Sequence, residues 1–182
     1  MEIYIIRHSP VNVPSGVCYG QSDVDVQETF FDEAMKLKTK LPDQFDAVIT
    51  SPLVRCQKMA KMFTATPLLD DRLKEMHFGD WEMKPWSSIP RTESQAWMNQ
   101  FDQIATPNGE SFQDLYARVS AFYTELKQKD YQKVLIVTHA GPIRCFWTYL
   151  LGFPLLNAFK IPVGFGEVLL IQSAYDTIVQ KS

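Results

Sequence analysis

Short apolar runs alternate with amphipathic segments along this chain, and that alternation constrains the fold more than any other feature. The runs at residues 3–6, 45–50 and 133–139 are rich in Ile and Val and have the length of strands covered on both faces. A helical pattern follows each run, directly or after a loop. Such alternation favours a mostly parallel sheet with helices on both faces. We therefore predict a three-layer α/β/α sandwich.

Four segments are expected to be helices. The clearest covers residues 112–126, where seven apolar residues fall on one helical face. A second covers residues 30–41 and is stopped by Pro42. Ser51-Pro52 has the capping residue and the proline with which helices often begin, and Gly141-Pro142 begins another helix.

Two long segments have neither a strand nor a helix period. Residues 11–26 are rich in turn formers and predict a long loop, and residues 64–93 combine prolines with aromatic residues. An irregular stretch of that length inside a domain is usually functional. Residues 167–179 predict a pair of closing strands at an antiparallel edge. With no repeat or linker in view, we expect residues 1–182 to form one domain.

Composition excludes several classes of function. Lys and Arg number 18 against 21 Asp and Glu, so the net charge is −3 and no bulk positive field draws the chain to nucleic acid or an anionic membrane. The three cysteines have no metal-ligand or disulfide spacing and indicate a reducing compartment. No window approaches the roughly 18 apolar residues of a membrane span, and no secretion signal is recognisable. We expect a cytoplasmic protein with no membrane partner.

Two arginines and two histidines fall at the ends of three predicted strands. Arg7 and His8 end the first run, Arg55 lies in the first turn of the helix after the second, and His139 ends the third. In open α/β sheets, ligands bind beyond the carboxyl ends of the strands. We therefore expect these four side chains to converge at one edge of the sheet.

Such a set suits a compact anion such as phosphate. Guanidinium groups bind oxyanions in bidentate fashion, and helix N-termini at Pro52 and Pro142 add free amides and partial positive charge. The sequence has no GxxxxGK[ST] motif and no metal-ligand spacing. We therefore expect the positive charge to come from the protein itself, with no cofactor or metal, which favours a covalent route.

A histidine nucleophile and a carboxylic acid would complete that route. Arg7 and Arg55 should keep the His8 ring neutral by charge repulsion. The departing alkoxide needs a proton, and Glu75 lies in the irregular segment, where burial and an approaching phosphate dianion would favour its protonated form.

These residues carry a family resemblance. The blocks "IIRHS", "TSPLVRCQKMA", "LKEMHFGDWE", "NGESF" and "VLIVTHAGPIR" resemble, in order and spacing along nearly the whole chain, those of the histidine phosphatase family with the phosphoglycerate mutase-like fold. The resemblance implies that His8 is the phosphorylated nucleophile and that Glu75 is the proton donor. It implies that the phosphate pocket consists of Arg7, Arg55 and His139.

The chain departs from the family pattern at three positions. Ser9 and Ala140 stand where the family usually has glycine, so the backbone at Ser9 must adopt a conformation open to serine. An asparagine common in the family aligns near Pro14, and Gln21 or Ser22 could replace it as a phosphate contact. Ser9, Gln21, Ser22 and Ala140 are therefore further candidate substrate-binding residues.

The substrate is expected to be a small phosphomonoester. Similar mutases are longer, whereas this sequence stops at "IVQKS" after its last predicted strand, which favours hydrolysis of the phosphohistidine by water. "GVCYGQSDVDV", "LKEMHFGDWEMKPW" and "PNGESFQDLYARV" most resemble the alpha-ribazole phosphatases of cobalamin nucleotide-loop assembly. This implies the 5′-phosphate of alpha-ribazole phosphate or its cobamide ester.

Alternatives remain open at this point. Tyr19, His77, Trp81 or Trp86 could stack on a flat base or simply pack in the core and the lid. The same catalytic residues could serve a broad-specificity sugar-phosphate or nucleotide phosphatase. A non-catalytic module that binds a phosphorylated ligand is the rival from a different class. The oligomeric state, monomer or dimer, is left open.

Overall fold

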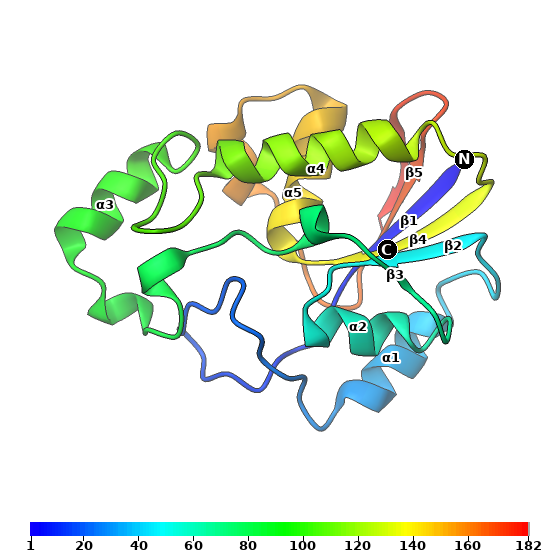
Figure 1. Ribbon diagram of the computed structural model, residues 1–182, viewed down its shortest axis with the longest axis horizontal. Coiled ribbons are helices and arrows are strands. Elements are labelled where there is room, and N and C mark those ends of the chain that lie inside the picture. Colours follow the sequence, from blue (N-terminus) through cyan, green and yellow to red (C-terminus); the bar gives the residue numbers. More distant parts are fainter. Residues whose placement is uncertain (182) are drawn as a thin grey trace.

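Within residues 1–181, which the computed structural model describes, six strands form a single sheet (Figure 1). They are β1 (Glu2–Arg7), β2 (Ala47–Thr50), β3 (Leu68–Leu69), β4 (Lys133–Thr138), β5 (Val168–Gln172) and β6 (Thr177–Lys181). The spatial order is β3-β2-β4-β1-β5-β6. The first four strands run parallel, while β5 pairs antiparallel with both β1 and β6. The predicted mostly parallel sheet with an antiparallel edge is confirmed.

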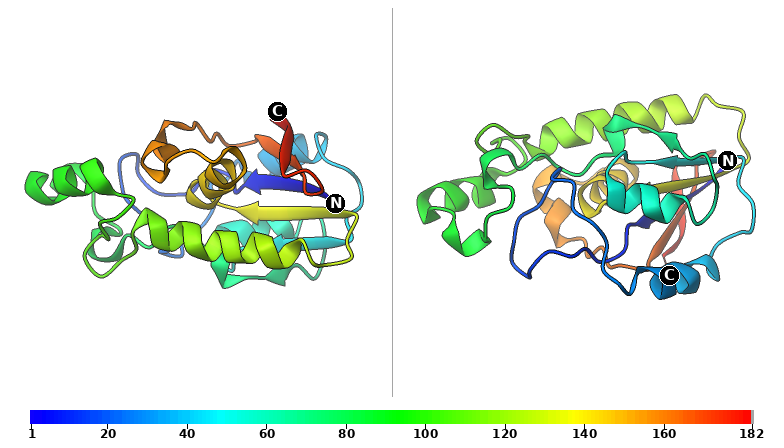
Figure 2. Two further views of the ribbon diagram at one scale, coloured as in Figure 1. Left: turned by 90° about the horizontal axis from the view of Figure 1, so that it is seen from above. Right: turned by 60° about the horizontal axis from the view of Figure 1, so that its bottom comes forward.

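Helices cover both faces of this sheet. They are α1 (Phe30–Lys38), α2 (Val54–Ala60), α3 (Arg91–Gln100), α4 (Phe112–Leu126) and α5 (Ala140–Leu151). In Figure 1, α1 and α2 lie on one side of the sheet, α4 and α5 lie on the other, and α3 lies away from it. Figure 2 shows β1 and β4, in blue and yellow, pointing the same way. The predicted three-layer arrangement is therefore confirmed.

Alternate residues of the central strands supply two separate hydrophobic cores. Ile5 of β1 and Ile136 of β4 pack with residues of α4 and α5. Ile6 and Val137, one position further along each strand, pack with residues of α1 and α2 instead. Because both faces of β1 and β4 are buried, the two strands appear in the sequence as continuous apolar runs.

Two helices begin at other residues than the sequence predicts. α2 begins at Val54 and not at Pro52, because Leu53 is extended and its amide donates to Ser51 Oγ at 3.3 Å. The Val54 amide donates to Asp23 Oδ1 at 2.7 Å, so a carboxylate from the 11–26 loop caps this helix. α5 begins one residue earlier than predicted, with His139 as its N-cap residue.

The segment predicted to be irregular contains more structure than expected. It includes β3 and the short 3₁₀ turns η1 (Asp71–Leu73), η2 (Gly79–Trp81) and η3 (Trp86–Ser88), and α3 begins in it. A fourth such turn, η4 (Leu155–Lys160), follows α5. No helix among the described residues is long and apolar enough to cross a bilayer.

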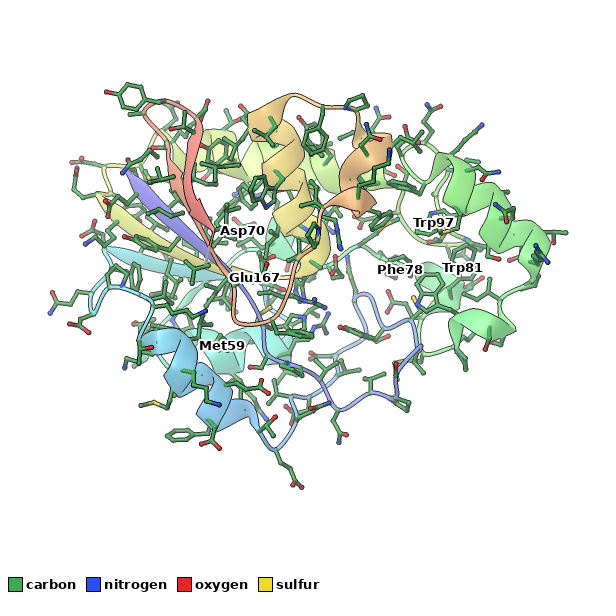
Figure 3. All side chains as sticks on the ribbon, turned by 180° about the vertical axis from the view of Figure 1, so that it is seen from behind. Met59, Asp70, Phe78, Trp81, Trp97 and Glu167 are labelled. Atoms are coloured by element: carbon green, nitrogen blue, oxygen red, sulfur yellow. The ribbon has the colours of Figure 1, made fainter. Side chains whose placement is uncertain are left out.

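An aromatic cluster holds this segment together. Figure 3 shows Phe78, Trp81 and Trp97 gathered on the side of the molecule that carries α3. The ring of Trp97 lies 5.6 Å from that of Trp81 and 5.9 Å from that of Phe78. Trp81 is buried in this cluster. The structure therefore shows Trp81 packed in the core, which is one of the two alternatives left open for this residue.

Candidate active site

The carboxyl edge of the sheet brings together the four residues predicted to converge there. Arg7 is the last residue of β1 and His8 follows it, Arg55 is the second residue of α2, and His139 follows β4. The rings of His8 and His139 lie 5.0 Å apart, and Arg55 Nε donates to His139 Nδ1 at 3.3 Å. Figure 1 shows α3 and the blue loop of residues 11–26 beyond the same edge. We call these four residues the His–Arg cluster.

The His8 ring is buried and held in one orientation. Its exposed fraction is 1%, and Nδ1 lies 2.6 Å from the carbonyl oxygen of Ser9, which can only accept. Nδ1 therefore carries the proton, and Nε2 presents its lone pair. Burial, together with the charges of Arg55 and Arg7, holds the pKa of His8 well below its ordinary value. A neutral imidazole with a free Nε2 is the form in which histidine acts as a nucleophile.

Ser9, which replaces the family's usual glycine, needs no unusual backbone. Among the described residues other than glycine, only Met83, Asn108 and Asp176 have positive φ, so the conformation at Ser9 is one that serine adopts readily. Its hydroxyl is buried and has no hydrogen-bond partner in residues 1–181. Ala140, at the other replaced glycine, is the first residue of α5 and is buried.

Arg7 is fixed by the loop that leads into β5. Its Nη1 donates to the carbonyl oxygen of Val163 at 2.9 Å, and its guanidinium carbon lies 3.8 Å from the centre of the Phe165 ring. The Phe165 ring also lies 5.8 Å from the His8 ring. Arg7 Nε is buried without a partner among the described residues, which leaves a donor for a ligand. Sequence reasoning missed Phe165.

Arg55 is fixed by the 11–26 loop. It is fully buried, and its Nη1 and Nη2 donate to the carbonyl oxygens of Ser22 and Gly20 at 2.9 and 2.6 Å. The Tyr19 ring lies 5.2 Å from its guanidinium carbon. Tyr19, offered as a stacking partner for a flat base, thus lies beside an arginine. Both arginines are held in a similar way, by an aromatic ring and backbone carbonyls of one loop, one carbonyl for Arg7 and two for Arg55.

His139 is engaged at both ring nitrogens. Nδ1 accepts from Arg55, so Nε2 carries the proton and donates to Ser51 Oγ at 2.8 Å. Burial and the charge of Arg55 hold the pKa of His139 well below its ordinary value. Ser51, which the sequence suggested as a helix cap, is therefore a partner of His139. No signal in the sequence links these two residues.

Glu75 lies at the N-terminus of α5, the helix that His139 precedes. Its Oε1 accepts from the amides of Gly141 and Met76 at 3.0 and 2.9 Å. A Cβ at Gly141 would collide with Glu75 Oε1, so the carboxylate approaches the helix only because residue 141 is glycine. A cavity of about 80 Å³ lies beside Glu75, with Phe78 and Arg144 in its wall.

Arg118 of α4 holds the backbone that carries Glu75. Its Nη2 donates to the Glu75 carbonyl at 2.8 Å, and its Nη1 donates to the Lys74 carbonyl at 2.7 Å. Nε and Nη2 also form a bidentate pair with Glu110, at 2.9 Å each. Sequence reasoning missed this role, although Glu110 and Arg118 both stand in a block that carried the family resemblance.

Gln21 and Ser22 lie differently from the other candidates. Gln21 Nε2 donates to the Glu75 carbonyl at 3.0 Å, and Ser22 Oγ donates to Glu82 at 2.6 Å. Glu82 Oε1 also accepts from the amides of Gln21 and Phe78. These bonds join the 19–22 loop to the segment that carries Glu75. The side chains of Gln21 and Ser22 thus already have protein partners, unlike the hydroxyl of Ser9.

The chemistry of the site follows from this arrangement. Two guanidinium groups lie beside a neutral histidine with a free Nε2, and a carboxylate lies at the neighbouring helix N-terminus. Such a set can hold a dianion, attack it and exchange a proton with a leaving group. Within residues 1–181 there is no group of three or more His, Cys, Asp or Glu side chains that could hold a metal ion.

Known proteins resemble this chain over nearly its whole length. The adenosylcobalamin/alpha-ribazole phosphatase of Escherichia coli K12 is 28% identical over 98% of this chain and 94% of that protein. The alpha-ribazole phosphatase structure from Shigella flexneri is 28% identical, with a TM-score of 0.88 over 98% of this chain and 93% of its own. A mycobacterial glucosyl-3-phosphoglycerate phosphatase, 21% identical over 93% of this chain and 88% of its own, has the same fold with a TM-score of 0.82.

The family assignment is also direct. The sequence profile of the histidine phosphatase superfamily, branch 1, matches residues 3–180, which include the whole His–Arg cluster and Glu75. The match therefore covers the fold and the site together. This chain belongs to branch 1 of the histidine phosphatase superfamily.

Proposed function

We propose that this protein hydrolyses phosphomonoesters through a phosphorylated His8. The observation that carries the proposal is the His8 ring itself, which is buried, kept neutral beside Arg7 and Arg55, and bonded through Nδ1–H to the Ser9 carbonyl. This leaves Nε2 free for attack on phosphorus. The family of the chain supports the same chemistry.

The reaction has two steps. His8 Nε2 forms a bond to phosphorus while the bond from phosphorus to the ester oxygen breaks, and protonated Glu75 gives its proton to the departing alkoxide. A water molecule then attacks the phosphohistidine, and Glu75 takes one of its protons as the phosphorus–nitrogen bond breaks. Arg7 and Arg55 stabilise the charge on the phosphoryl oxygens in both steps. The products are the alcohol and inorganic phosphate.

We propose alpha-ribazole 5′-phosphate, or its cobamide ester, as the substrate. The names of the relatives from Escherichia coli and Shigella flexneri support this choice. The buried, unpaired state of all three cysteines agrees with a reducing compartment, and we place the protein in the cytoplasm.

The nucleophile is tested with two of the three histidines. His8→Ala should lower kcat/KM for p-nitrophenyl phosphate by at least about 10³-fold, since the covalent route is lost. His77→Ala is the matched control, because His77 is half exposed and its nearest charged partner is Glu82 at 4.0 Å. Acid-labile, base-stable phosphate on the wild-type protein, absent from His8→Ala, would identify the intermediate. Equal activity in the two variants would refute the mechanism.

The substrate is tested with a panel of phosphomonoesters. Alpha-ribazole 5′-phosphate should have a kcat/KM about 10²-fold or more above those of sugar phosphates and nucleotides of equal charge. Comparable values across the panel would contradict the proposed substrate and establish a broad-specificity phosphatase on the same residues. No turnover of any member would instead support a module that only binds phosphorylated ligands.

A further inference from the structure

A second and larger cavity lies on the α1 side of the His–Arg cluster. Its volume is about 410 Å³, which is within the usual range for small-molecule sites. It shares no lining residue with the cavity beside Glu75. A leaving group protonated by Glu75 therefore lies elsewhere. We call it the α1 cavity.

The α1 cavity has an apolar wall. Leu37 of α1 and Met59 of α2 line it, and Phe165 and Gly166 line it from the loop before β5. Figure 3 shows Met59 beside α1, below the loop that leads into β5. Walls of this kind bury the apolar body of a ligand, while a few polar groups fix its orientation.

Positive charge dominates the polar part of the wall. Arg7, Lys36 and Lys40 line the cavity with Glu33 as the one acidic residue, a balance of +2 in a chain whose net charge is −3. Lys40 Nζ donates to the Gly166 carbonyl at 3.0 Å across the rim, and two of its three N–H groups remain for a ligand. The Lys36 ammonium has no hydrogen bond or ion pair within residues 1–181.

Two residues that line the cavity also carry buried donors without partners. The donors are Arg7 Nε and Ser9 Oγ. Buried polar atoms are nearly always hydrogen-bonded in native proteins, so an ordered water or a ligand is the expected partner of each donor. A hydrogen-bond acceptor on a ligand could pair with Arg7 Nε or Ser9 Oγ, which have no protein partner within residues 1–181.

We propose that the α1 cavity binds a small organic anion, with its apolar body on Leu37 and Met59 and its acidic group held by Lys36 and Lys40. Because Arg7 lines this cavity and also belongs to the His–Arg cluster, the bound anion and a phosphoryl group share one arginine. A ligand here therefore weakens phosphate binding without occupying the place of the leaving group.

The test uses the fluorescent aromatic sulfonate 8-anilinonaphthalene-1-sulfonate as the probe, titrated into the folded protein. Lys36→Glu and Lys40→Glu should each weaken its binding about fivefold or more, since attraction becomes repulsion at the wall. Lys38→Glu is the matched control. It changes the charge by the same amount, on the same helix as Lys36 and two residues before Lys40, but Lys38 Nζ donates to the Met62 carbonyl and does not line the cavity.

Circular dichroism should show the same helix content in the three variants, because all three lysines are exposed. Equal probe affinity in Lys36→Glu, Lys40→Glu and Lys38→Glu would overturn the proposal. So would an equal loss in all three, which would mean that only net charge matters. The titration needs no turnover, so its outcome does not depend on the proposed phosphatase activity.

Discussion

At the scale of single residues, the two arginines of the His–Arg cluster are held by contacts that no local pattern encodes. Arg7 lies 156 positions from Val163, and Arg55 lies 33 positions from Ser22. The four residues of the cluster could be predicted because each falls at the end of a recognisable strand or in the helix turn after one. Phe165 could not, because one phenylalanine between two glycines gives no sign of which guanidinium it will cover.

The stack between Arg7 and Phe165 leads to a prediction at this scale. Phe165→Leu should raise KM for p-nitrophenyl phosphate about three- to tenfold with a smaller change in kcat, because the loss of a cation–π contact leaves Arg7 less well oriented. Phe165→Tyr keeps the aromatic face and should restore the wild-type KM. The ring is 42% exposed, so neither variant should lose much stability.

Equal KM values for Phe165→Leu and Phe165→Tyr would show that the aromatic face has no part in orienting Arg7. A thermal melt of both variants controls for a general loosening of the fold.

At the scale of elements, the helices and strands that bury many side chains could be predicted from the sequence, and those that bury few could not. β1 and β4 bury several residues each in continuous apolar runs, α4 buries six residues at helical spacing, and all three elements were predicted. α3 was missed because Trp97 is its one buried residue, and β3 was missed because its two residues are exposed. The start of α2 was misplaced because its capping carboxylate, Asp23, comes from a distant loop.

The contact between α4 and the segment that carries Glu75 leads to a prediction at this scale. Arg118→Lys keeps the positive charge but cannot form the fork that reaches Glu110 and the carbonyls of residues 72, 74 and 75 at once. The Glu75 backbone then loses its anchor. We expect kcat for an alkyl phosphate to fall about tenfold or more, with a smaller fall for p-nitrophenyl phosphate, whose leaving group needs little protonation.

Glu75→Gln removes the acid itself and should cause the largest fall in kcat. As in Arg118→Lys, kcat should fall more for the alkyl phosphate than for p-nitrophenyl phosphate. A uniform loss on both esters in Arg118→Lys would mean that the substitution only destabilises the protein. The free energy of unfolding, from a urea titration, should fall by about 1–3 kcal/mol as buried hydrogen bonds are lost.

At the scale of the whole molecule, burying two neutral histidines makes stability depend on pH. The pKa values of His8 and His139 are both lowered by burial, so the unfolded chain binds more protons than the folded protein at acidic pH. Stability from these residues is fully present above the unfolded pKa of about 6.5 and is lost as the pH falls below it. Each residue should cost up to about 1.4 kcal/mol at pH 5.5, the limit reached when the folded ring takes up no proton.

Urea unfolding at pH 7.5 and 5.5 measures this difference. His8→Asn should remove roughly half of it, whereas His77→Asn, at a half-exposed position, should leave it nearly intact. The same pH dependence in all three proteins would mean that His8 is protonated inside the fold, in conflict with its burial beside two arginines.

The antiparallel direction of β5 determines which loop can change the selectivity of this site. A parallel strand brings the loop after it to the catalytic edge, but an antiparallel strand brings the loop before it. The turn at residues 163–166 therefore reaches Arg7 from a part of the chain that contributes neither the proposed nucleophile nor the proposed acid. Substitutions in that turn change the surroundings of Arg7 without replacing His8 or Glu75, so variation in selectivity should be sought there first.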